Sequence, residues 1–530
     1  MESFSVVSPH LTETATELHS VYESHTQHVE RVDGKLVCKP AIQTIHFRTQ
    51  KTVPKLGLMM IGLGGNNGTT VTAQILANRE HVRWETKDGP MEANFLGSLL
   101  QCSTSSLGFC GEEEVFVPFK SLVPLVDPTQ IVVGGWDINN MNLADAMRRA
   151  KVLDINLQQQ VAPMMRHMVP LPSVYIPDFI ASEQSERANN TLPATLSRWE
   201  AVEHLRADIR NFKTANHLDK IVVLWTASTE RFCQETVGVH DSADNLLAAI
   251  HASHAEISPS TLFAVASILE GCAFVNGSPQ NTLVPGVVDL ATRHHVPIAG
   301  SDFKTGQTKL KSVLVDFLIS SGIRPLSVVS YNHLGNNDGA NLANPRCFRS
   351  KEISKSSVCD DMIAGNQVLF PEGKKDGPDH LVIIKYCPAV GDSKRAMDEY
   401  YSEIAMGGKN TISIHNVCED SLLAAPVIID LACTIELFTR IEVAAAGAPG
   451  SALEYQPFHP LMGSFLGFLL KAPLVAPGVP LVNSLFKQRL CLENLLRVLR
   501  GLEPNTLMNL ERNVEAARHP AVPTFAAIHH

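Results

Sequence analysis

A glycine-rich turn near residue 62 constrains the fold more than any other feature. Residues 55–61 (KLGLMMI) form a short apolar run, residues 62–68 read GLGGNNG, and residues 69–77 continue with helical character. In a strand–turn–helix unit of this kind, glycines let the backbone approach a pyrophosphate and the helix N-terminus supplies N–H donors. The spacing departs by one residue from G-x-G-x-x-G, and a tight turn without a ligand is the alternative. We therefore predict nucleotide binding at this turn.

Short β-branched runs recur over the first 300 residues, with helical stretches between them. Runs at 131–133, 221–224 and 296–298 are separated by helix-like segments such as 142–152 and 243–252. This alternation predicts the α/β class, a doubly wound parallel sheet of the Rossmann type with helices on its faces. Asp137, just after the first of these runs, is the acidic residue best placed for ribose hydroxyls.

The alternation of strands and helices is absent before residue 55 and changes after about residue 308. Residues 1–54 are polar and histidine-rich without clear periodicity, and we expect an extension that wraps the protein or frays. From about residue 308, strands are expected at 326–330, 380–387 and 411–415 with few helices between them, which predicts a second, sheet-rich domain. A long apolar helix is expected over 422–443, with Asp420 or Ser421 as its N-cap.

Composition and charge exclude several classes of protein. The net charge is −10 and no basic block stands out, so we expect no nucleic-acid partner. Lys471 and three prolines interrupt the apolar stretch 461–482, which argues against a membrane span, and no secretory signal is seen at the start. The 11 scattered cysteines contain no C-x-x-C pair and indicate reduced thiols in a cytoplasmic protein. No histidine spacing indicates a metal site.

Four polar segments directly follow expected strands. Ligands of open α/β sheets bind outside the carboxyl ends of the strands, so these segments predict one convergent site. They are residues 225–231 (WTASTER), 300–304 (GSDFK), 332–339 (NHLGNNDG) and 388–394 (PAVGDSK).

Four lysines add a chemical indication. Lys351 and Lys355 are four residues apart, so a helix there would present both on one face. Lys394 follows a Gly-Asp-Ser turn, and Lys471 lies among large apolar residues, where it must snorkel or face an anion. Most lysines are simply solvated. Together, however, these four could bind a phosphate and stabilise an oxyanion beside it.

The motifs resemble those of the eukaryotic-type myo-inositol-1-phosphate synthases. They occur in the family's order from about residue 56 to the final helices. Ser228 stands where asparagine is common, and Thr305 replaces a serine, but both keep a small polar side chain. The matching motifs are GLGGNNGTT (from 62), LWTASTERF (224), NGSPQNTLVPG (276), GSDFKTGQTK (300), SYNHLGNNDG (330), SKEISKSSVCDDM (350) and GDSKRAMDEY (391).

This resemblance implies a layout and a reaction. Residues 55–308 and a returning segment, 422–530, would form an NAD-binding Rossmann domain after the extension 1–54. The inserted α+β domain, 309–421, would serve catalysis and tetramer assembly. The implied reaction converts D-glucose 6-phosphate to 1D-myo-inositol 3-phosphate by C5 oxidation, enolisation, intramolecular aldol cyclisation and re-reduction, with NAD as cofactor.

The resemblance also implies site residues. The catalytic set would be Lys351, Lys355, Lys394, Lys471 and Asp302. We expect Lys351 to handle the C5 hydroxyl proton, Lys394 and Lys471 to stabilise the enolate and alkoxide, and Lys355 to help on phosphate. The implied cofactor contacts are Gly64, Gly65, Asn66, Asn67, Asp137, Gln184, Arg187, Thr226, Ala227, Gly277, Ser278, Asp302, Asn336, Asn337, Asp338, Asp392, Asp420 and Ser421.

Two other functions fit parts of the pattern. A net NAD-dependent dehydrogenase of a sugar phosphate or semialdehyde would explain the glycine turn but leaves four lysines without a shared role. A catalytically silent NAD-binding sensor would be expected to lose some of those lysines. Net NADH release distinguishes the dehydrogenase from the isomerase, and any turnover excludes the sensor.

Overall fold

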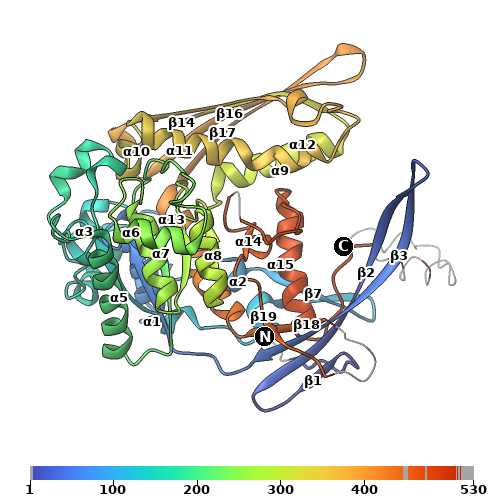
Figure 1. Cartoon of the computed structure of the whole chain (residues 1–530), viewed down its shortest axis with the longest axis horizontal. Helices are drawn as coiled ribbons and strands as arrows, with labels where there is room; N and C mark the ends of the chain where they lie inside the picture. Colours follow the sequence, from blue (N-terminus) through green and yellow to red (C-terminus); the bar gives the residue numbers. More distant parts are fainter. Residues whose placement is uncertain (1–3, 446–451, 472–473, 509, 511–513, 515–530) are drawn as a thin grey trace.

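A computed structural model describes residues 4–445, 452–471, 474–508, 510 and 514. Three sheets organise this part of the chain: a parallel sheet between helices, a four-stranded sheet laid over a second group of helices, and a sheet that carries a long N-terminal hairpin (Figure 1). The third sheet lies at the opposite end of the molecule from α3 and α5.

The first sheet confirms the predicted α/β class. All of its neighbouring strands are parallel. The apolar run after residue 55 forms its central strand, β4. In spatial order the strands are β10 (Leu171–Pro172), β9 (Val132–Asp137), β4 (Leu56–Ile61), β11 (Lys220–Trp225), β12 (Ala273–Asn276) and β13 (Ile298–Gly300).

Helices cover both faces of this sheet because alternate side chains of each strand point to opposite sides. Leu58 and Met60 of β4 pack into one apolar cluster, whereas Met59 and Ile61 pack into the other. The first cluster includes α1 (Asn66–Arg79), α3 (Leu143–Ala150), α4 (Ile155–Met165) and α13 (Asp420–Phe438). The second includes α5 (Arg198–Ala215), α6 (Ala243–His251), α7 (Pro259–Leu269) and α8 (Pro285–His294).

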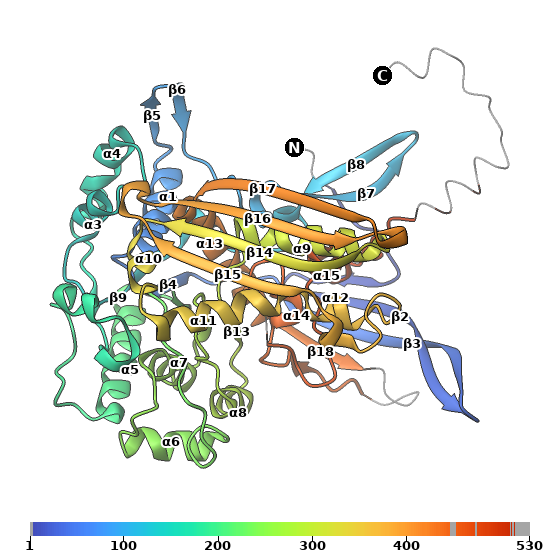
Figure 2. The same cartoon turned by 90° about the horizontal axis from the view of Figure 1, so that it is seen from above.

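The second sheet has the order β15 (Asp379–Tyr386), β14 (Arg324–Leu334), β16 (Ser393–Glu403) and β17 (Lys409–Glu419). Our expectation of few helices in this region was wrong, because four helices cover one face of the sheet or its end (Figure 2). They are α9 (Gly306–Ser320), α10 (Asn337–Asn341), α11 (Pro345–Ser356) and α12 (Asp360–Ala364). Strand β16 was not predicted, because its buried positions include the polar Asp398 and Ser402 while the apolar Met397 is exposed, so no apolar alternation marks it.

The N-terminal extension is a regular structure. It forms β1 (Leu11–Glu13), β2 (Glu17–Val32) and β3 (Lys35–Gln50), which pair with β18 (Ile441–Ala445) and β19 (Gln456–Pro457). Only the base of the β2–β3 hairpin is buried, at Leu18, Ser20, Phe47 and Thr49, and the remainder projects from the body (Figure 1). Both faces of the projecting part are largely exposed, so the sequence there lacks the apolar alternation that reveals a strand.

Helix α13 is shorter than the predicted segment 422–443. It ends at Phe438, and β18 follows at Ile441 and pairs with β3. Both parts are apolar and buried, so composition could not separate them. The N-cap prediction was also wrong: Glu419 occupies that position, and Asp420 and Ser421 are the first helical residues. Although α13 is long and apolar enough to cross a membrane, 89% of its most apolar window is buried inside the protein, as in a core helix.

Shorter elements complete the described chain. Helices α9 and α13 each span one of the expected domain boundaries, at 308 and 421, so the exact division stays an interpretation. Apart from short 3-10 helices, the remaining elements are two hairpins, β5 (Arg83–Thr86) with β6 (Gly89–Glu92) and β7 (Thr104–Cys110) with β8 (Glu113–Pro118), and helices α2 (Leu99–Cys102), α14 (Gly463–Leu466) and α15 (Leu485–Leu499).

Candidate active site

A cavity of about 540 Å³ lies at the carboxyl ends of β4, β9 and β11, where these strands face the second sheet and α11. All four predicted polar segments contribute to its lining. Every predicted site residue lines it except Gly64 and Lys355, which lie behind its wall. The structure therefore brings the expected residues around one cavity.

The glycine turn joins β4 to α1 in the manner that the sequence predicts. Gly62 has φ of +90°, and a Cβ there would lie 2.7 Å from backbone atoms of Ala227. Gly65 is the N-cap of α1 and offers no side chain to the first N–H groups of the helix, which begins at Asn66. Gly65 and Asn66 line the cavity. A helix N-terminus without a side-chain cap is an anion-binding element.

Asp137 ends β9 beside this turn. Its Oδ2 accepts a hydrogen bond from the backbone N–H of Gly64 at 2.9 Å, and its Oδ1 accepts one from Asn139 at 2.9 Å. Burial raises the pKa of Asp137, and Arg187 and Arg149 oppose the rise. Arg149 also donates to the carbonyl of Gly64 at 2.5 Å. A carboxylate placed here can accept from hydroxyls of a bound ribose.

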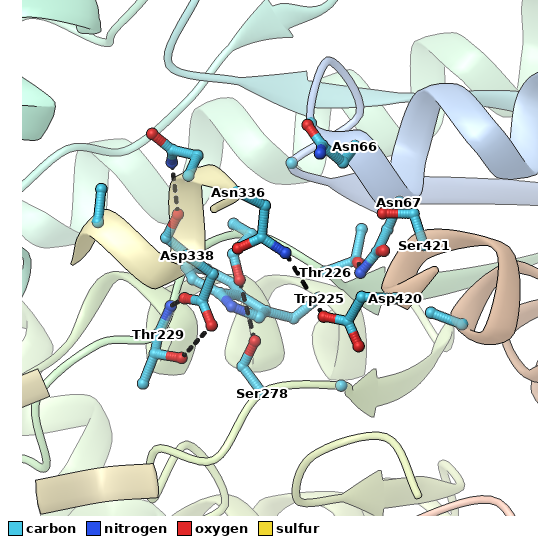
Figure 3. A pocket seen from close by; sticks show the side chains of 18 of the residues that line it. Asn66, Asn67, Trp225, Thr226, Thr229, Ser278, Asn336, Asp338, Asp420 and Ser421 are labelled. Atoms are coloured by element: carbon cyan, nitrogen blue, oxygen red, sulfur yellow. Dashed lines mark hydrogen bonds between the residues drawn. The ribbon is translucent and has the colours of Figure 1, made fainter. Parts of the chain in front are cut away.

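Amide and hydroxyl groups line the middle of the cavity and bond across elements (Figure 3). Asn67 Nδ2 donates to Thr226 Oγ1 at 3.0 Å, and Ser278 Oγ donates to the carbonyl of Ala227 at 2.9 Å. Asp338 accepts from the backbone N–H of Thr229 at 2.8 Å. These bonds fix the loop after β11 against β12 and α10.

The second sheet closes on the glycine turn through Asp392. Its Oδ1 accepts from Asn66 Nδ2 at 2.9 Å and from the Ser421 hydroxyl at 2.7 Å, and its Oδ2 accepts from the Ser421 backbone N–H at 2.9 Å. Beside it, Asn336 Nδ2 donates to Asp420 at 3.4 Å (Figure 3). The N-termini of α1 and α13 thus meet at one carboxylate.

Asn337 connects this wall to the segment around Gln184. The two side-chain amides exchange hydrogen bonds of 3.0 and 3.3 Å, and Asn337 Nδ2 also lies 3.0 Å from Ser228 Oγ. Ser228, which departs from the family pattern, therefore has a defined partner.

Gly277 lies close to the edge of the Phe303 ring. A Cβ at this position would lie 2.1 Å from the ring, so only glycine fits there.

Asp302 lies at the centre of the lysine cluster. It has φ of +58°, is only 4% exposed, and follows β13. Lys351 Nζ, on α11, lies 2.9 and 3.0 Å from its two carboxylate oxygens, and Lys471 Nζ forms a second ion pair with it. Burial alone would raise the pKa of Asp302, but the two ammonium groups outweigh burial and lower it below its usual value.

The other two lysines surround this pair. Lys394 Nζ lies 3.5 Å from Asp420. Lys355 Nζ, 2% exposed, donates to Gln307 Oε1 at 2.9 Å and to Asn332 Oδ1 at 3.3 Å. Burial and the neighbouring lysines lower the pKa of Lys355 well below its ordinary value, and burial lowers that of Lys471 to about 7 although Asp302 opposes this.

Sequence reasoning did not single out several residues that line the cavity, and three of them carry ionisable groups that bear on its chemistry: Arg149, Tyr175 and Glu230. Arg149 and Tyr175 flank the Asp137 end of the cavity, and the Tyr175 hydroxyl is buried without a hydrogen-bond partner among the described residues. Burial raises the pKa of Glu230 to about 8, and its carboxylate accepts from the Ser260 hydroxyl at 2.6 Å. Only Glu230 had a signal, its place in the WTASTER segment, because the other two lie outside any recognisable motif.

The donor set fits a dinucleotide. An uncapped helix N-terminus, a carboxylate at the end of the adjacent strand and a Tyr175 hydroxyl without a partner in the described part of the chain line the same cavity. Among the described residues, no group of three or more His, Cys, Asp or Glu side chains is placed to hold a metal ion.

Comparisons with known proteins agree with this geometry. The sequence profile described as myo-inositol-1-phosphate synthase, from an NAD-binding group of families, matches residues 56–497. The chain belongs to the myo-inositol-1-phosphate synthase family. The inositol-3-phosphate synthase of Sesamum indicum is 55% identical over 96% of this chain and 99% of its own length. Human inositol-3-phosphate synthase 1 is also 55% identical, over 97% of this chain and 90% of its own length.

A solved structure of the same family confirms the fold. The crystal structure of inositol-3-phosphate synthase from Caenorhabditis elegans is 48% identical, has a TM-score of 0.93 and covers 99% of this chain. A myo-inositol-1-phosphate synthase-related protein from Thermotoga maritima, at 18% identity and a TM-score of 0.59, shares the fold.

Proposed function

We propose that this chain is an inositol-3-phosphate synthase, an NAD-dependent isomerase that converts D-glucose 6-phosphate to 1D-myo-inositol 3-phosphate. Its family membership supports this activity. The observation that carries the proposal is the lysine cluster around Asp302, which meets the nucleotide-binding turn in one cavity. A dehydrogenase needs one acid–base group beside its cofactor, whereas a cyclisation must stabilise successive oxyanions.

The cofactor side of the cavity is suited to NAD. The N–H groups at the start of α1 would hold the pyrophosphate, Asp137 the ribose hydroxyls, and Ser278 and Asp302 the region of the nicotinamide. Bound NAD would supply a hydride acceptor for C5 of the sugar and return that hydride after ring closure. The chain itself supplies the proton transfers and the oxyanion stabilisation.

The lysines divide this work. Asp302 outweighs burial, raises the pKa of Lys351 and keeps it cationic, so Lys351 is placed to return a proton to the C5 oxygen when the ketone is reduced. The amine that takes this proton during the oxidation must be neutral, and Lys471, whose pKa burial lowers to about 7, meets that condition. Lys394 and Lys471 line the cavity and stabilise the enolate and the aldol alkoxide, because an ammonium aimed at a developing oxyanion acts strongly in a dry site. Lys355 lies behind them and adds positive charge for the phosphate.

We propose that the enzyme is a cytoplasmic homotetramer assembled through the second sheet. The outer face of this sheet exposes Tyr331 (51%), Leu381 (48%), Met397 (57%) and Val417 (51%), an apolar patch typical of an interface. Size-exclusion chromatography with light scattering tests this assembly. We expect a tetramer, and smaller species after Met397→Glu combined with Val417→Lys.

Purified protein with glucose 6-phosphate and catalytic NAD is the direct test of function. Phosphorus NMR should show a new inositol phosphate signal while absorbance at the NADH band stays flat. Stoichiometric NADH would establish the dehydrogenase instead. NAD binding without turnover would establish the silent sensor.

A further inference from the structure

A buried chain of hydrogen bonds leads from β16 to the lysine cluster. Asp398 Oδ1 accepts from Gln307 Nε2 at 2.5 Å, and Gln307 Oε1 accepts from Lys355 Nζ at 2.9 Å. The Tyr400 hydroxyl donates to the other oxygen of Asp398 at 3.4 Å. All four side chains are at most 6% exposed. Asp398 lies within the GDSKRAMDEY motif, but the resemblance assigned it neither a cofactor contact nor a catalytic role.

The carboxylate fixes which way the Gln307 amide points. An amide carries a donor group and an acceptor oxygen, and an ionised carboxylate only accepts. Asp398 therefore takes the NH₂ group of Gln307 and leaves its carbonyl directed to Lys355. Asn332 repeats the arrangement, because its Nδ2 donates to the carbonyl of Ile383 at 3.4 Å and its Oδ1 faces Lys355.

This orientation matters because Lys355 lies close to four other lysines. Burial and the positive charges of Lys394, Lys471, Lys311 and Lys351 all disfavour its ammonium form. Two carbonyl oxygens that accept from Lys355 favour the ammonium form, whereas a reversed Gln307 amide would present its NH₂ group and disfavour it further.

We propose that Asp398 is a positioning residue that acts through the Gln307 amide to keep Lys355 cationic for the substrate phosphate. This inference rests on the proposed function, in which Lys355 contributes charge to phosphate binding. Asp398 itself does not line the cavity. Its effect is transmitted across α9, which carries Gln307, to α11, which carries Lys355.

Two substitutions at Asp398 separate positioning from general damage. Asp398→Ala frees the Gln307 amide to reverse, and we expect kcat/KM for glucose 6-phosphate to fall about tenfold, the size of one buried hydrogen bond to a charged group. Asp398→Asn keeps an oxygen that can accept from Gln307, so it should remain within about threefold of the wild type.

The pH profile gives a readout that a structural defect would not move. If Lys355 must be cationic, activity falls as pH rises through its pKa. Losing the carbonyl contact lowers that pKa, so the alkaline limb of kcat/KM in Asp398→Ala should move to lower pH. Asp430→Ala is the matched control, because Asp430 is a buried carboxylate that accepts from Ser98 and Leu99 and does not line the cavity. It should lower the melting temperature without moving the limb.

A double-mutant cycle tests the route through Gln307. Gln307→Met removes the amide but leaves Asp398, and it should show the same loss and the same pH shift. Adding Asp398→Ala to it should cost less than about a further twofold, since the two residues act as one unit. Additive losses, an unshifted limb, or wild-type kinetics in Gln307→Met would overturn the proposal, even if Asp398→Ala fails to fold.

Failure of the proposed function would look different. A wild-type protein that makes no inositol phosphate would reject the synthase activity without involving Asp398. Calorimetric binding of glucose 6-phosphate by the wild type and Asp398→Asn, Asp398→Ala and Gln307→Met variants would then test the positioning alone. Equal affinities in all four proteins at pH 8 would overturn it.

Discussion

The two walls of the cavity are built on different principles. The cofactor wall, formed by Gly65, Asn66, Asn67, Asp137 and Thr226, consists of backbone N–H groups, amides, a hydroxyl and one carboxylate, most of which hold partners on neighbouring loops. The lysine wall, formed by Lys351, Lys394 and Lys471 with Lys355 behind them, gathers four amines beside two carboxylates, Asp302 and Asp420.

The difference shows where each wall obtains its affinity for a ligand. Polar groups that satisfy one another are stable without a ligand, so the cofactor wall is a preformed surface. Buried amines in excess of carboxylates are penalised by burial and mutual repulsion, and an anion relieves that penalty. Substrate phosphate and developing oxyanions therefore gain interaction energy that the free protein lacks.

The substitution with the largest expected effect removes an amine from the lysine wall. Lys351→Met removes the amine that contacts both oxygens of Asp302, and we expect kcat to fall about 10³-fold, within the range for a lost acid–base group. NAD affinity, measured by quenching of intrinsic fluorescence, should change less than about threefold because the cofactor wall is intact.

Lys304→Met is the matched control for that substitution. Lys304 is also a fully buried lysine, but its amine bonds to Gln488 Oε1 at 2.7 Å and it does not line the cavity. Its loss should lower stability and leave kcat within about threefold. Equal kcat losses in both variants would show that burial of a lysine, and not its place beside Asp302, determines activity.

Breaking the cofactor wall should have the opposite signature. Asp137→Ala removes the carboxylate that accepts from Gly64 and Asn139, and we expect the Kd for NAD to rise about 10- to 100-fold, as for hydrogen bonds to a charged group. At saturating NAD, kcat and the pH profile should stay near those of the wild type. A kcat loss that saturating NAD does not restore would mean that the two walls are coupled.

Proton uptake on substrate binding should distinguish the lysine wall from the cofactor wall. Burial lowers the pKa of Lys471 to about 7, so this amine is mostly neutral at pH 8 in the free protein. A bound phosphate dianion raises that pKa, so at pH 8 glucose 6-phosphate should bind with uptake of about one proton per site. Calorimetry in buffers of different ionisation enthalpy measures this uptake.

The pH dependence of that uptake has a defined sign. Below pH 6 Lys471 is already charged in the free protein, so its contribution disappears there. Lys471→Met should remove the same contribution at pH 8. NAD binding is the internal reference, because the cofactor wall holds none of these lysines and should take up few protons. Zero uptake with glucose 6-phosphate at pH 8 would reject the picture of a lysine wall relieved by an anion.

Sequence reasoning recovered the cofactor wall more fully than the lysine wall. The glycine turn is local, because backbone geometry demands Gly62 whatever lies elsewhere in the chain. Lys351 and Lys355 were also placed by local spacing once α11 was assumed to be helical. The packing of Lys471 against Asp302, 169 positions away in the sequence, required the family resemblance, because no local signal links them.

The missed elements share one physical cause. Strands β2, β3 and β16 place apolar and polar side chains at both exposed and buried positions, so no apolar alternation marks them. The chain from Asp398 to Lys355 depends on how β16 packs against α9. Such contacts are tertiary, and a periodicity argument sees only one element at a time.

The smallest expected effect lies at Ser228, within the cofactor wall's outer loop. Its hydroxyl accepts from Asn337 Nδ2 at 3.0 Å, while the same amide group is also bonded to Gln184. Because Asn337 keeps its second partner, Ser228→Ala should raise the Kd for NAD only about two- to fivefold, as for one neutral hydrogen bond. Ser228→Asn keeps a polar side chain, so its Kd for NAD should lie between those of the wild type and Ser228→Ala. A change in kcat, or in the alkaline limb of the pH profile, with Ser228→Ala would show that this amide cluster affects the lysine wall. The two walls would then not act independently.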